Sequence, residues 1–362
     1  MLSALILTWR KDDALFQLDG PRGISSLILL ADGRHVVCAC KAEKTIHMRN
    51  IEDHGEREPL LINLSVAVNV IAASKDGKLI VTGDVDGKVV VWDTSLQKRS
   101  EAAERHGRMI TALDVSPPYV ASGSNDGTVV LWTMREPGFG PAVPGPLMRH
   151  THGSISVSSV MFSPTGSRVA SACAHWGCSV KIWHTRTGDQ IESIRIDSLP
   201  THSLAWSSDG RRLFAGGPNG SIHCFDTVTR KPFSKVVEPR PGDDSISSLR
   251  VSNSGQFLIS CSAPGRTVDI WDTRDTLAYK PLHSYGRCVS ASISPDDLYL
   301  ASSGDDTKIS IRNLPGVVES SYFFHVSQYN LHESITSFLS LAHRPFTESL
   351  RACMSDHSAP VY

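Results

Sequence analysis

A segment ending in Trp-Asp, or in a variant of it, recurs seven times along the chain. The best preserved copies are VTGDVDGKVVVWDT at 81–94 and VASGSNDGTVVLWTM at 120–134, and successive copies lie 40–51 residues apart. A period of this length indicates repeated units that bury their surfaces only by stacking on neighbouring units. The position of the tryptophan falls at Arg49, Trp92, Trp132, Trp183, Phe225, Trp271 and Arg312.

Each repeat predicts four short strands. An Asp-Gly pair between two apolar runs, as in 81–94, predicts a β-hairpin. Another strand precedes the hairpin, as in ISSLILLADG at 24–33, and a short one follows it, as in ESIRID at 192–197. Helical periodicity is almost absent, so the pattern predicts an all-β protein built from four-stranded units.

These motifs resemble the WD40 repeat family, and the resemblance covers nearly the whole chain. It implies a β-propeller, in which four-stranded blades surround a channel and strands a to d run from the axis outward. We therefore predict a single propeller domain over residues 1–362. Its repeats are expected at about 24–58, 66–99, 107–138, 154–189, 199–231, 244–277 and 286–319.

The two ends of the chain favour an eighth, composite blade. LILTWRK and ALFQLDG, within 1–18 and its flank, match strands c and d, whereas SITSFLSLA and SLRACMSD, within 334–362, match strands a and b. Joining the halves would close the ring and remove open sheet edges. The alternative is a seven-bladed ring that ALFQLDG alone completes, with a C-terminal tail after about residue 320.

Composition narrows the classes of partner. The formal charge is −1 without a block of basic residues, so we expect no nucleic-acid partner. The N-terminal apolar run ALILTW is too short for a membrane span, and eight cysteines without a CxxC pair are typical of a reducing compartment. We expect a cytoplasmic protein without membrane attachment or cofactor, and the nucleus stays open.

Four residues of the third repeat combine the side chains of a serine hydrolase. His106, Ser122, Asp126 and Trp132 fall, however, on the positions of the WD40 structural tetrad. The resemblance implies that these side chains hydrogen-bond in series inside one blade. A serine nucleophile also needs an oxyanion hole and an open approach, which a packed strand lacks, so we interpret the four as structural.

The turn CAHWGCS at 173–179 is the most unusual turn of the chain. Cys173, His175 and Cys178 form a poor zinc site because no fourth ligand is close in sequence, so we expect no metal. Trp176 has no counterpart in the core pattern of the repeats. It could anchor an interface, as tryptophan often does, or fold over its own blade.

Turn residues that differ between otherwise similar repeats are candidates for partner recognition. We expect the binding face to carry the d-to-a and b-to-c connections, where the repeats share no chemistry. The proposed partner-binding residues are Arg108, Asn125, His175, Trp176 and Asp305.

Two functions remain open besides a propeller enzyme. The first is a non-catalytic scaffold that binds protein or peptide partners. The second is a substrate receptor of a cullin-RING ubiquitin ligase, because Trp271, Asp272 and Arg274 in WDTR resemble the WDxR motif. An enzyme would need several convergent acidic or histidine side chains on the inner strands. The segments ISSL, VNVI, ITAL, VSSV and HSLA supply almost none, so we predict no catalysis.

Overall fold

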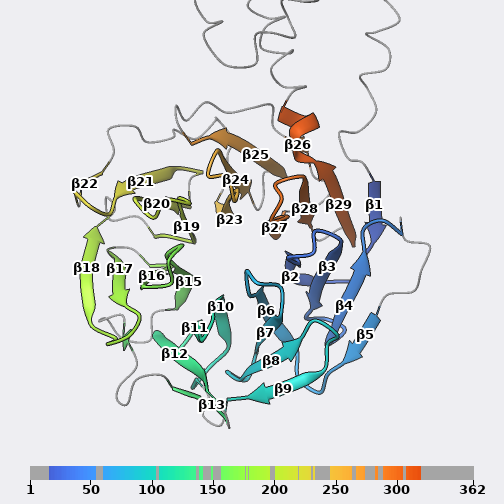
Figure 1. The fold of residues 1–362 in the computed structure, drawn as a ribbon, viewed down its shortest axis with the longest axis horizontal. Helices are drawn as coiled ribbons and strands as arrows, with labels where there is room; N and C mark the ends of the chain where they lie inside the picture. Colours follow the sequence, from blue (N-terminus) through green and yellow to red (C-terminus); the bar gives the residue numbers. More distant parts are fainter. Residues whose placement is uncertain are drawn as a thin grey trace, which may run out of the picture. The chain divides into compact units, whose positions relative to one another are not determined.

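Seven antiparallel sheets form a ring in the described part of the chain (Figure 1). The chain divides into two compact units, 1–317 and 318–362, and the ring belongs to the first. The inner strands β2, β6, β10, β15, β19, β23 and β27 each contact the next one, and β27 contacts β2, so the ring is closed. The computed structural model describes residues 16–53, 60–102, 106–135, 138–141, 148–149, 156–175, 177, 179–195, 200–218, 220–229, 231–232, 245–262, 266–273, 282–283, 288–304 and 307–318.

The first four blades are numbered in chain order, and their strands a to d are given from the channel outward. Blade 1 contains β2 (Ile24–Leu29), β3 (His35–Cys40), β4 (Thr45–Asn50) and β5 (Leu60–Asn63). Blade 2 contains β6 (Val68–Ala73), β7 (Leu79–Asp84), β8 (Val89–Asp93) and β9 (Lys98–Glu101). Blade 3 contains β10 (Ile110–Ser116), β11 (Tyr119–Ser124), β12 (Thr128–Arg135), β13 (Gly138–Pro141) and β14 (Met148–Arg149). Blade 4 contains β15 (Val157–Phe162), β16 (Arg168–Cys173), β17 (Ser179–His184) and β18 (Gln190–Arg195).

The last three blades repeat the pattern, and the seventh takes its outer strand from the N-terminal region. Blade 5 contains β19 (Ser203–Trp206), β20 (Arg212–Gly216), β21 (Ile222–Asp226) and β22 (Lys231–Pro232). Blade 6 contains β23 (Ile246–Val251), β24 (Phe257–Ser262), β25 (Thr267–Asp272) and β26 (Leu282–His283). Blade 7 contains β27 (Ser290–Ile293), β28 (Tyr299–Ser303), β29 (Lys308–Asn313) and β1 (Phe16–Asp19).

The favoured eight-bladed ring is therefore wrong, and the seven-bladed alternative describes the fold. β1 pairs directly with β29 in the register Phe16 to Ile311, so ALFQLDG fills the outer position of blade 7. A short helical turn at 314–318, in a segment with Pro315 and Gly316, follows β29 where the other repeats continue to their own outer strand. Trp9 and residues 334–362, which the eighth blade would have used, lie outside the described residues.

Blade 3 carries an insertion in its outer strand. The four prolines of 136–146 favour an extended loop after strand c, yet Gly138–Pro141 within this segment forms β13. β13 pairs with the second half of the long strand β12, and β14 pairs with its first half. The insertion therefore lies within the outer strand and divides it into two short pieces.

The a-to-b turns use the same side-chain chemistry in several blades. In blade 2 the Ser74 hydroxyl donates to Asp76 Oδ1 at 2.6 Å and accepts from the Leu79 amide at 3.0 Å, while Gly77 takes a φ of +71°. Asp297 occupies the corresponding left-handed position in blade 7 with a φ of 58°. These turns explain why Ser-x-Asp-Gly recurs at the end of the inner strands.

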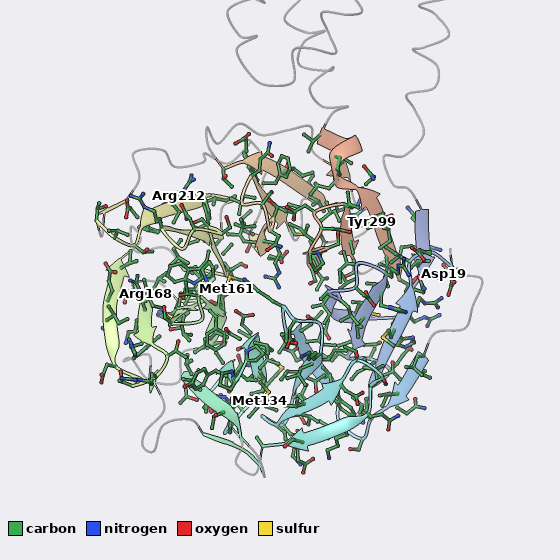
Figure 2. All side chains as sticks on the ribbon, in the orientation of Figure 1. Asp19, Met134, Met161, Arg168, Arg212 and Tyr299 are labelled. Atoms are coloured by element: carbon green, nitrogen blue, oxygen red, sulfur yellow. The ribbon has the colours of Figure 1, made fainter. Side chains whose placement is uncertain are left out.

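The hydrophobic core is distributed between the blades, where side chains of adjacent sheets meet (Figure 2). The c-strand aromatic packs against the preceding blade in each case: Trp132 joins Val81 and Val91 of blade 2. Each blade is thus stabilised mainly by its neighbours, as expected for stacked repeats. The aromatics placed in this way are Trp92, Trp132, Trp183, Phe225 and Trp271.

A bulge at the start of the inner strands adds a polar connection between blades. The register of the a–b pair shifts around one residue in five blades, and that residue carries a hydroxyl or amide group. Its side chain donates to a backbone carbonyl of the next blade, and we call this bond an inter-blade latch. The latches are Ser25 to Val68 (3.0 Å), Asn69 to Ile110 (2.8 Å), Thr111 to Val157 (2.5 Å), Ser158 to Thr201, and Ser247 to Cys288 (2.9 Å).

Candidate functional site

In blade 3 a continuous chain of hydrogen-bonded side chains starts at Trp132 on strand c. It passes through His106, in the loop before strand a, and ends at Asp126 in the b–c turn. Trp132 Nε1 donates to Ser122 Oγ at 2.7 Å, and Ser122 Oγ lies 2.7 Å from His106 Nε2. On the other side of the imidazole, Nδ1 lies 2.8 Å from the hydroxyl of Thr128, which donates to Asp126. All directions agree when Ser122 donates to Nε2 and the Nδ1 proton points to Thr128, so each group has a partner.

Asp126 holds the loop end of this chain. Burial raises the pKa of its carboxyl, but hydrogen bonds from His106 and Thr128 outweigh burial and hold that pKa below its ordinary value. The carboxylate also accepts from the Gly107 amide at 2.8 Å and from the Thr128 amide at 2.9 Å. It therefore connects the b–c turn to the segment that enters β10.

Ser122 is buried and hydrogen-bonded inside the sheet of blade 3. Its side chain is fully buried, and its oxygen bonds both the indole of Trp132 and the imidazole of His106. A nucleophile needs access to substrate and a free approach, which this position does not offer. The geometry thus favours the structural interpretation of His106, Ser122, Asp126 and Trp132.

Other blades share the bond between strands c and b of this chain. A c-strand indole donates to a b-strand hydroxyl from Trp92 to Thr82 (2.9 Å), from Trp183 to Ser171 (2.7 Å) and from Trp271 to Ser260 (2.9 Å). In blade 7 the guanidinium of Arg312 takes the place of the indole and donates to Ser302 at 3.0 Å. The b–c hydrogen bond therefore survives the loss of the aromatic ring.

The described recognition residues predicted from sequence are Arg108, Asn125 and His175, and they lie on one side of the ring, which we call the loop face. It carries the b–c turns and d–a connections, including 41–44, 85–88, 106–109, 125–127 and 174–175. Arg108 and His175 are exposed there. Asn125 is half-buried, and its Oδ1 accepts from Ser156 at 2.5 Å, so it joins blades 3 and 4. Trp176 and Asp305 lie outside the described residues.

Lys41 belongs to the same face, although sequence reasoning missed it. It follows β3 in an exposed turn, and its Nζ reaches Asn69 Oδ1 at 3.3 Å and Met109 Sδ at 3.5 Å. A side chain from blade 1 thereby contacts the first residues of blades 2 and 3. Its position in the sequence could have identified it: Lys41 is the first residue of the b–c turn of blade 1, as Asn125 is in blade 3.

The WDxR-like motif is largely internal to blade 6. Trp271 is 6% exposed and Asp272 is 2% exposed, and the indole of Trp271 bonds Ser260 inside the blade. Arg274 lies outside the described residues. The two described residues of the motif are therefore placed as core residues.

No group of three or more metal-binding side chains occurs within the described residues. His175 is exposed, Cys178 is not described, and Cys173 is disulfide-bonded, which differs from the expectation of free cysteines. Cys38, Cys40, Cys224, Cys261 and Cys288 are free and buried. The described part of the chain also contains no helix long and apolar enough to cross a membrane.

Comparison with known proteins agrees with this geometry. The family model "WD domain, G-beta repeat" matches six segments that together cover more than half of the chain: 62–93, 101–133, 145–184, 195–226, 235–272 and 279–313. The chain belongs to the WD-repeat family. Blade 1 lies almost entirely outside these segments, and it has Cys38 and Arg49 where blade 3 has Ser122 and Trp132.

The curated relatives of this WD-repeat protein are distant. Small ribosomal subunit protein RACK1y of Oryza sativa subsp. japonica is 32% identical over 155 residues, which cover 40% of this chain and 43% of the relative. A guanine nucleotide-binding protein subunit beta of Oryza sativa subsp. indica is 29% identical over 209 residues, covering 53% of this chain and 52% of the relative. The match to human Coronin-7 is 27% identical and covers 55% of this chain but 22% of the relative. The chain thus spans about half or less of the length of these relatives.

A solved structure resembles the fold over a larger share of the chain. A chain of the mitotic checkpoint complex superposes with a TM-score of 0.71 at 19% identity, covering 83% of this chain and 91% of that chain. At this identity the likeness concerns the fold alone.

Proposed function

We propose that this WD-repeat protein is a non-catalytic scaffold that binds protein or peptide partners on its loop face. The supporting observation is that its polar side chains fall into two groups, one bonded inside the sheets and one exposed in turns. In blade 3 the groups that resemble a hydrolase site are bonded to one another inside the sheet, whereas Arg108, His175 and Lys41 project from turns. Rigid sheets that present variable turns suit recognition of a partner.

Membership of the WD-repeat family supports the same proposal by analogy, because fold alone does not determine function. The match to a guanine nucleotide-binding protein subunit and the structural likeness to a chain of a checkpoint complex concern proteins named as parts of assemblies. The partners of this protein are a separate question that capture from cells addresses.

The test is affinity capture of the full chain followed by mass spectrometry, with matched charge-reversal variants. Arg108→Glu alters the loop face, and Arg186→Glu makes the same change at an exposed position in the c–d turn of blade 4, on the opposite side. We expect Arg108→Glu to lose captured proteins while Arg186→Glu keeps them. Equal capture by both variants and by the unchanged protein would contradict a loop-face site that includes Arg108.

The same experiment addresses the other sequence hypotheses. Trp176→Ala should lose partners without lowering the melting temperature if Trp176 anchors the interface, whereas a fall in melting temperature would mark it as a packing residue. Enrichment of a cullin adaptor that disappears with Arg274→Ala would favour the ligase-receptor alternative. Retention of all partners by Arg274→Ala would remove the motif from the interface.

A further inference from the structure

Lys41 is a cation whose contacts in the described part of the chain are neutral. Its ammonium group reaches the amide oxygen of Asn69 at 3.3 Å and the thioether of Met109 at 3.5 Å. A thioether is a weak acceptor, and neither contact neutralises the charge. An ammonium group has three donors, so this position can bind a carboxylate without giving up a strong bond.

Asn69 fixes the place of that charge. Its amide nitrogen donates to the Ile110 carbonyl at 2.8 Å in the latch between blades 2 and 3, which turns Oδ1 towards Lys41. The side chain of Lys41 is thereby held across the start of the inner strands β6 and β10, on the loop face, and we call this inner edge of the ring the rim. Holding a flexible lysine in one place lowers the entropy lost when a ligand binds.

Arg108 supplies a second cation on the same rim, because it precedes Met109 in the chain. Its backbone is held by the Ser124 hydroxyl, which donates to the Arg108 carbonyl at 3.0 Å, and by the Asn125 amide, which donates to the Met109 carbonyl at 3.0 Å. The exposed guanidinium makes no hydrogen bond or ion pair with the described residues. The backbone of Arg108 is therefore held in place next to Met109, the residue that Lys41 contacts, and its guanidinium has no anionic partner among the described residues.

The acidic side chains of the neighbouring turns do not form ion pairs with Lys41 or Arg108. Asp126 accepts from Thr128 and Gly107, Glu43 accepts from the Arg22 amide at 3.0 Å, and Asp84 accepts from the amides of its own turn. Asp86 is exposed in the b–c turn of blade 2 and would repel an anion there. Because these carboxylates keep their charge, a ligand carboxylate is favoured only close to the two cations of the rim, Lys41 and Arg108, which have no anionic partner among the described residues.

We propose that this rim recognises an acidic segment of a protein partner, with a carboxylate at Lys41 and another at Arg108. The inference rests on the proposed scaffold function and names the chemistry of its ligand. Complementary charges at such a rim raise the rate of encounter and select the partner more than they add affinity. Binding is therefore weakened by salt, because exposed charge pairs are screened.

The test measures fluorescence anisotropy of a labelled peptide rich in glutamate, about twelve residues long, with the full chain at about 0.05 M and about 0.3 M salt. A peptide of the same length with glutamine in place of glutamate is the ligand control. The rim variant Lys41→Gln/Arg108→Gln is compared with Lys78→Gln/Arg186→Gln, which removes one exposed lysine and one exposed arginine from the opposite side. Melting curves establish that both variants are folded.

We expect the glutamate peptide to bind the unchanged protein, to bind the rim variant at least about fivefold more weakly, and to bind the control variant as before. Asp86→Asn should strengthen binding. The proposal is overturned if the glutamate peptide fails to bind the unchanged protein, if the glutamine peptide binds equally, or if both double variants lose affinity alike. Should acidic binding fail while Arg108→Glu still loses captured proteins, the scaffold function stands and its ligand has another chemistry.

Discussion

The junctions of blades 1 to 6 with one another differ from the two junctions that flank blade 7. In the first group an aromatic side chain of strand c packs against the preceding blade, as Trp132 does against blade 2. At the corresponding position, Arg312 faces blade 6 and Arg49 faces blade 7. An aromatic ring buries a large apolar surface, whereas a buried guanidinium must be hydrogen-bonded to avoid a cost. Nε of Arg49 is buried without a hydrogen bond within the described residues.

The latches also distinguish the blade 7–1 junction from the blade 6–7 junction. Ser247 joins blade 6 to blade 7 through the Cys288 carbonyl, but the equivalent residue of blade 7 is Val289, which has no side-chain donor. The blade 7–1 junction therefore lacks both the aromatic and the latch that hold blade 3 to its neighbours. We infer that the ring is weakest where its two ends meet.

Strand β1 compensates for this weakness. Leu18 is 1% exposed and joins the core between blades 7 and 1, and Asp19, labelled in Figure 2, pairs with Lys308 of β29. Ser290 and Ser292 of blade 7 accept hydrogen bonds from the Leu27 and Leu29 amides of blade 1 at 3.4 and 3.0 Å. Four residues from the N-terminal region thus complete the last blade.

Removal of β1 should give the largest effect. Deleting residues 1–19 exposes the edge of β29 and empties the place of Leu18, and loss of a buried leucine alone typically costs about 2–5 kcal/mol. We expect the melting temperature to fall by roughly 10 °C or more. Differential scanning calorimetry of the full chain and the truncated chain measures the change.

Two further truncations control this result. Deleting 2–13 spares β1 and should leave the melting temperature nearly unchanged. Deleting 334–362 should also have little effect, because β1 closes the seven-bladed ring without that segment. A large loss on deleting 334–362 would show that the C-terminal region contributes to stability in a way the ring does not explain.

Breaking the polar chain of blade 3 should give the next largest effect. His106→Ala leaves Ser122 and Thr128 without their shared partner inside a buried network, which should cost about 1–3 kcal/mol. Urea unfolding measures the loss, and His184→Ala, at a half-buried position in blade 4, is the control. A hydrolytic activity that Ser122→Ala abolishes in folded protein would instead support an enzyme.

Much of the fold could be predicted from sequence because repetition amplifies a weak local signal. A single hairpin is marginal, yet seven related segments at a similar period identify stacked sheets and place Trp92, Trp132 and Trp183 in the core. The number of blades could not be predicted in the same way. The N-terminal region could supply strand d alone or strands c and d together, and its local pattern does not distinguish the two. Only the pairing of Phe16 with Ile311 shows that it supplies strand d of blade 7.

The site was less predictable than the fold. His106, Ser122 and Trp132 could be placed together because repeats align their positions. Lys41 and the latches could not be placed in this way. For the latches the reason is a bulge, which shifts the register by one residue and directs Ser25 or Asn69 towards the next blade. Polar residues in ISSL and VNVI were visible, but alternation alone does not show to which blade they point.

Acid should affect blade 3 through Asp126. Because hydrogen bonds hold the pKa of Asp126 below the unfolded value, its ionised form stabilises the folded protein fully above about pH 4. That contribution is lost as the pH falls from there through the folded pKa. Asp126→Asn should therefore flatten the fall in unfolding free energy below about pH 4, measured by urea titration. A slope for Asp126→Asn equal to that of the unchanged protein would contradict the assignment.

The smallest effect should come from adding a latch to the blade 7–1 junction. Val289 stands where Ser25, Ser158 and Ser247 donate to the next blade, so the hydroxyl of Val289→Ser can reach the backbone carbonyl of Ile24. One hydrogen bond contributes about 0.5–1.5 kcal/mol, and the loss of the larger valine side chain subtracts from this gain. We therefore expect a small net rise in stability and slower hydrogen exchange of the amides in β27 and β2. Val289→Ala is the matched control, since it removes the same methyl groups without adding a donor. If serine and alanine give equal stability and equal exchange, the missing latch is not what distinguishes this junction, and the two arginines carry the difference.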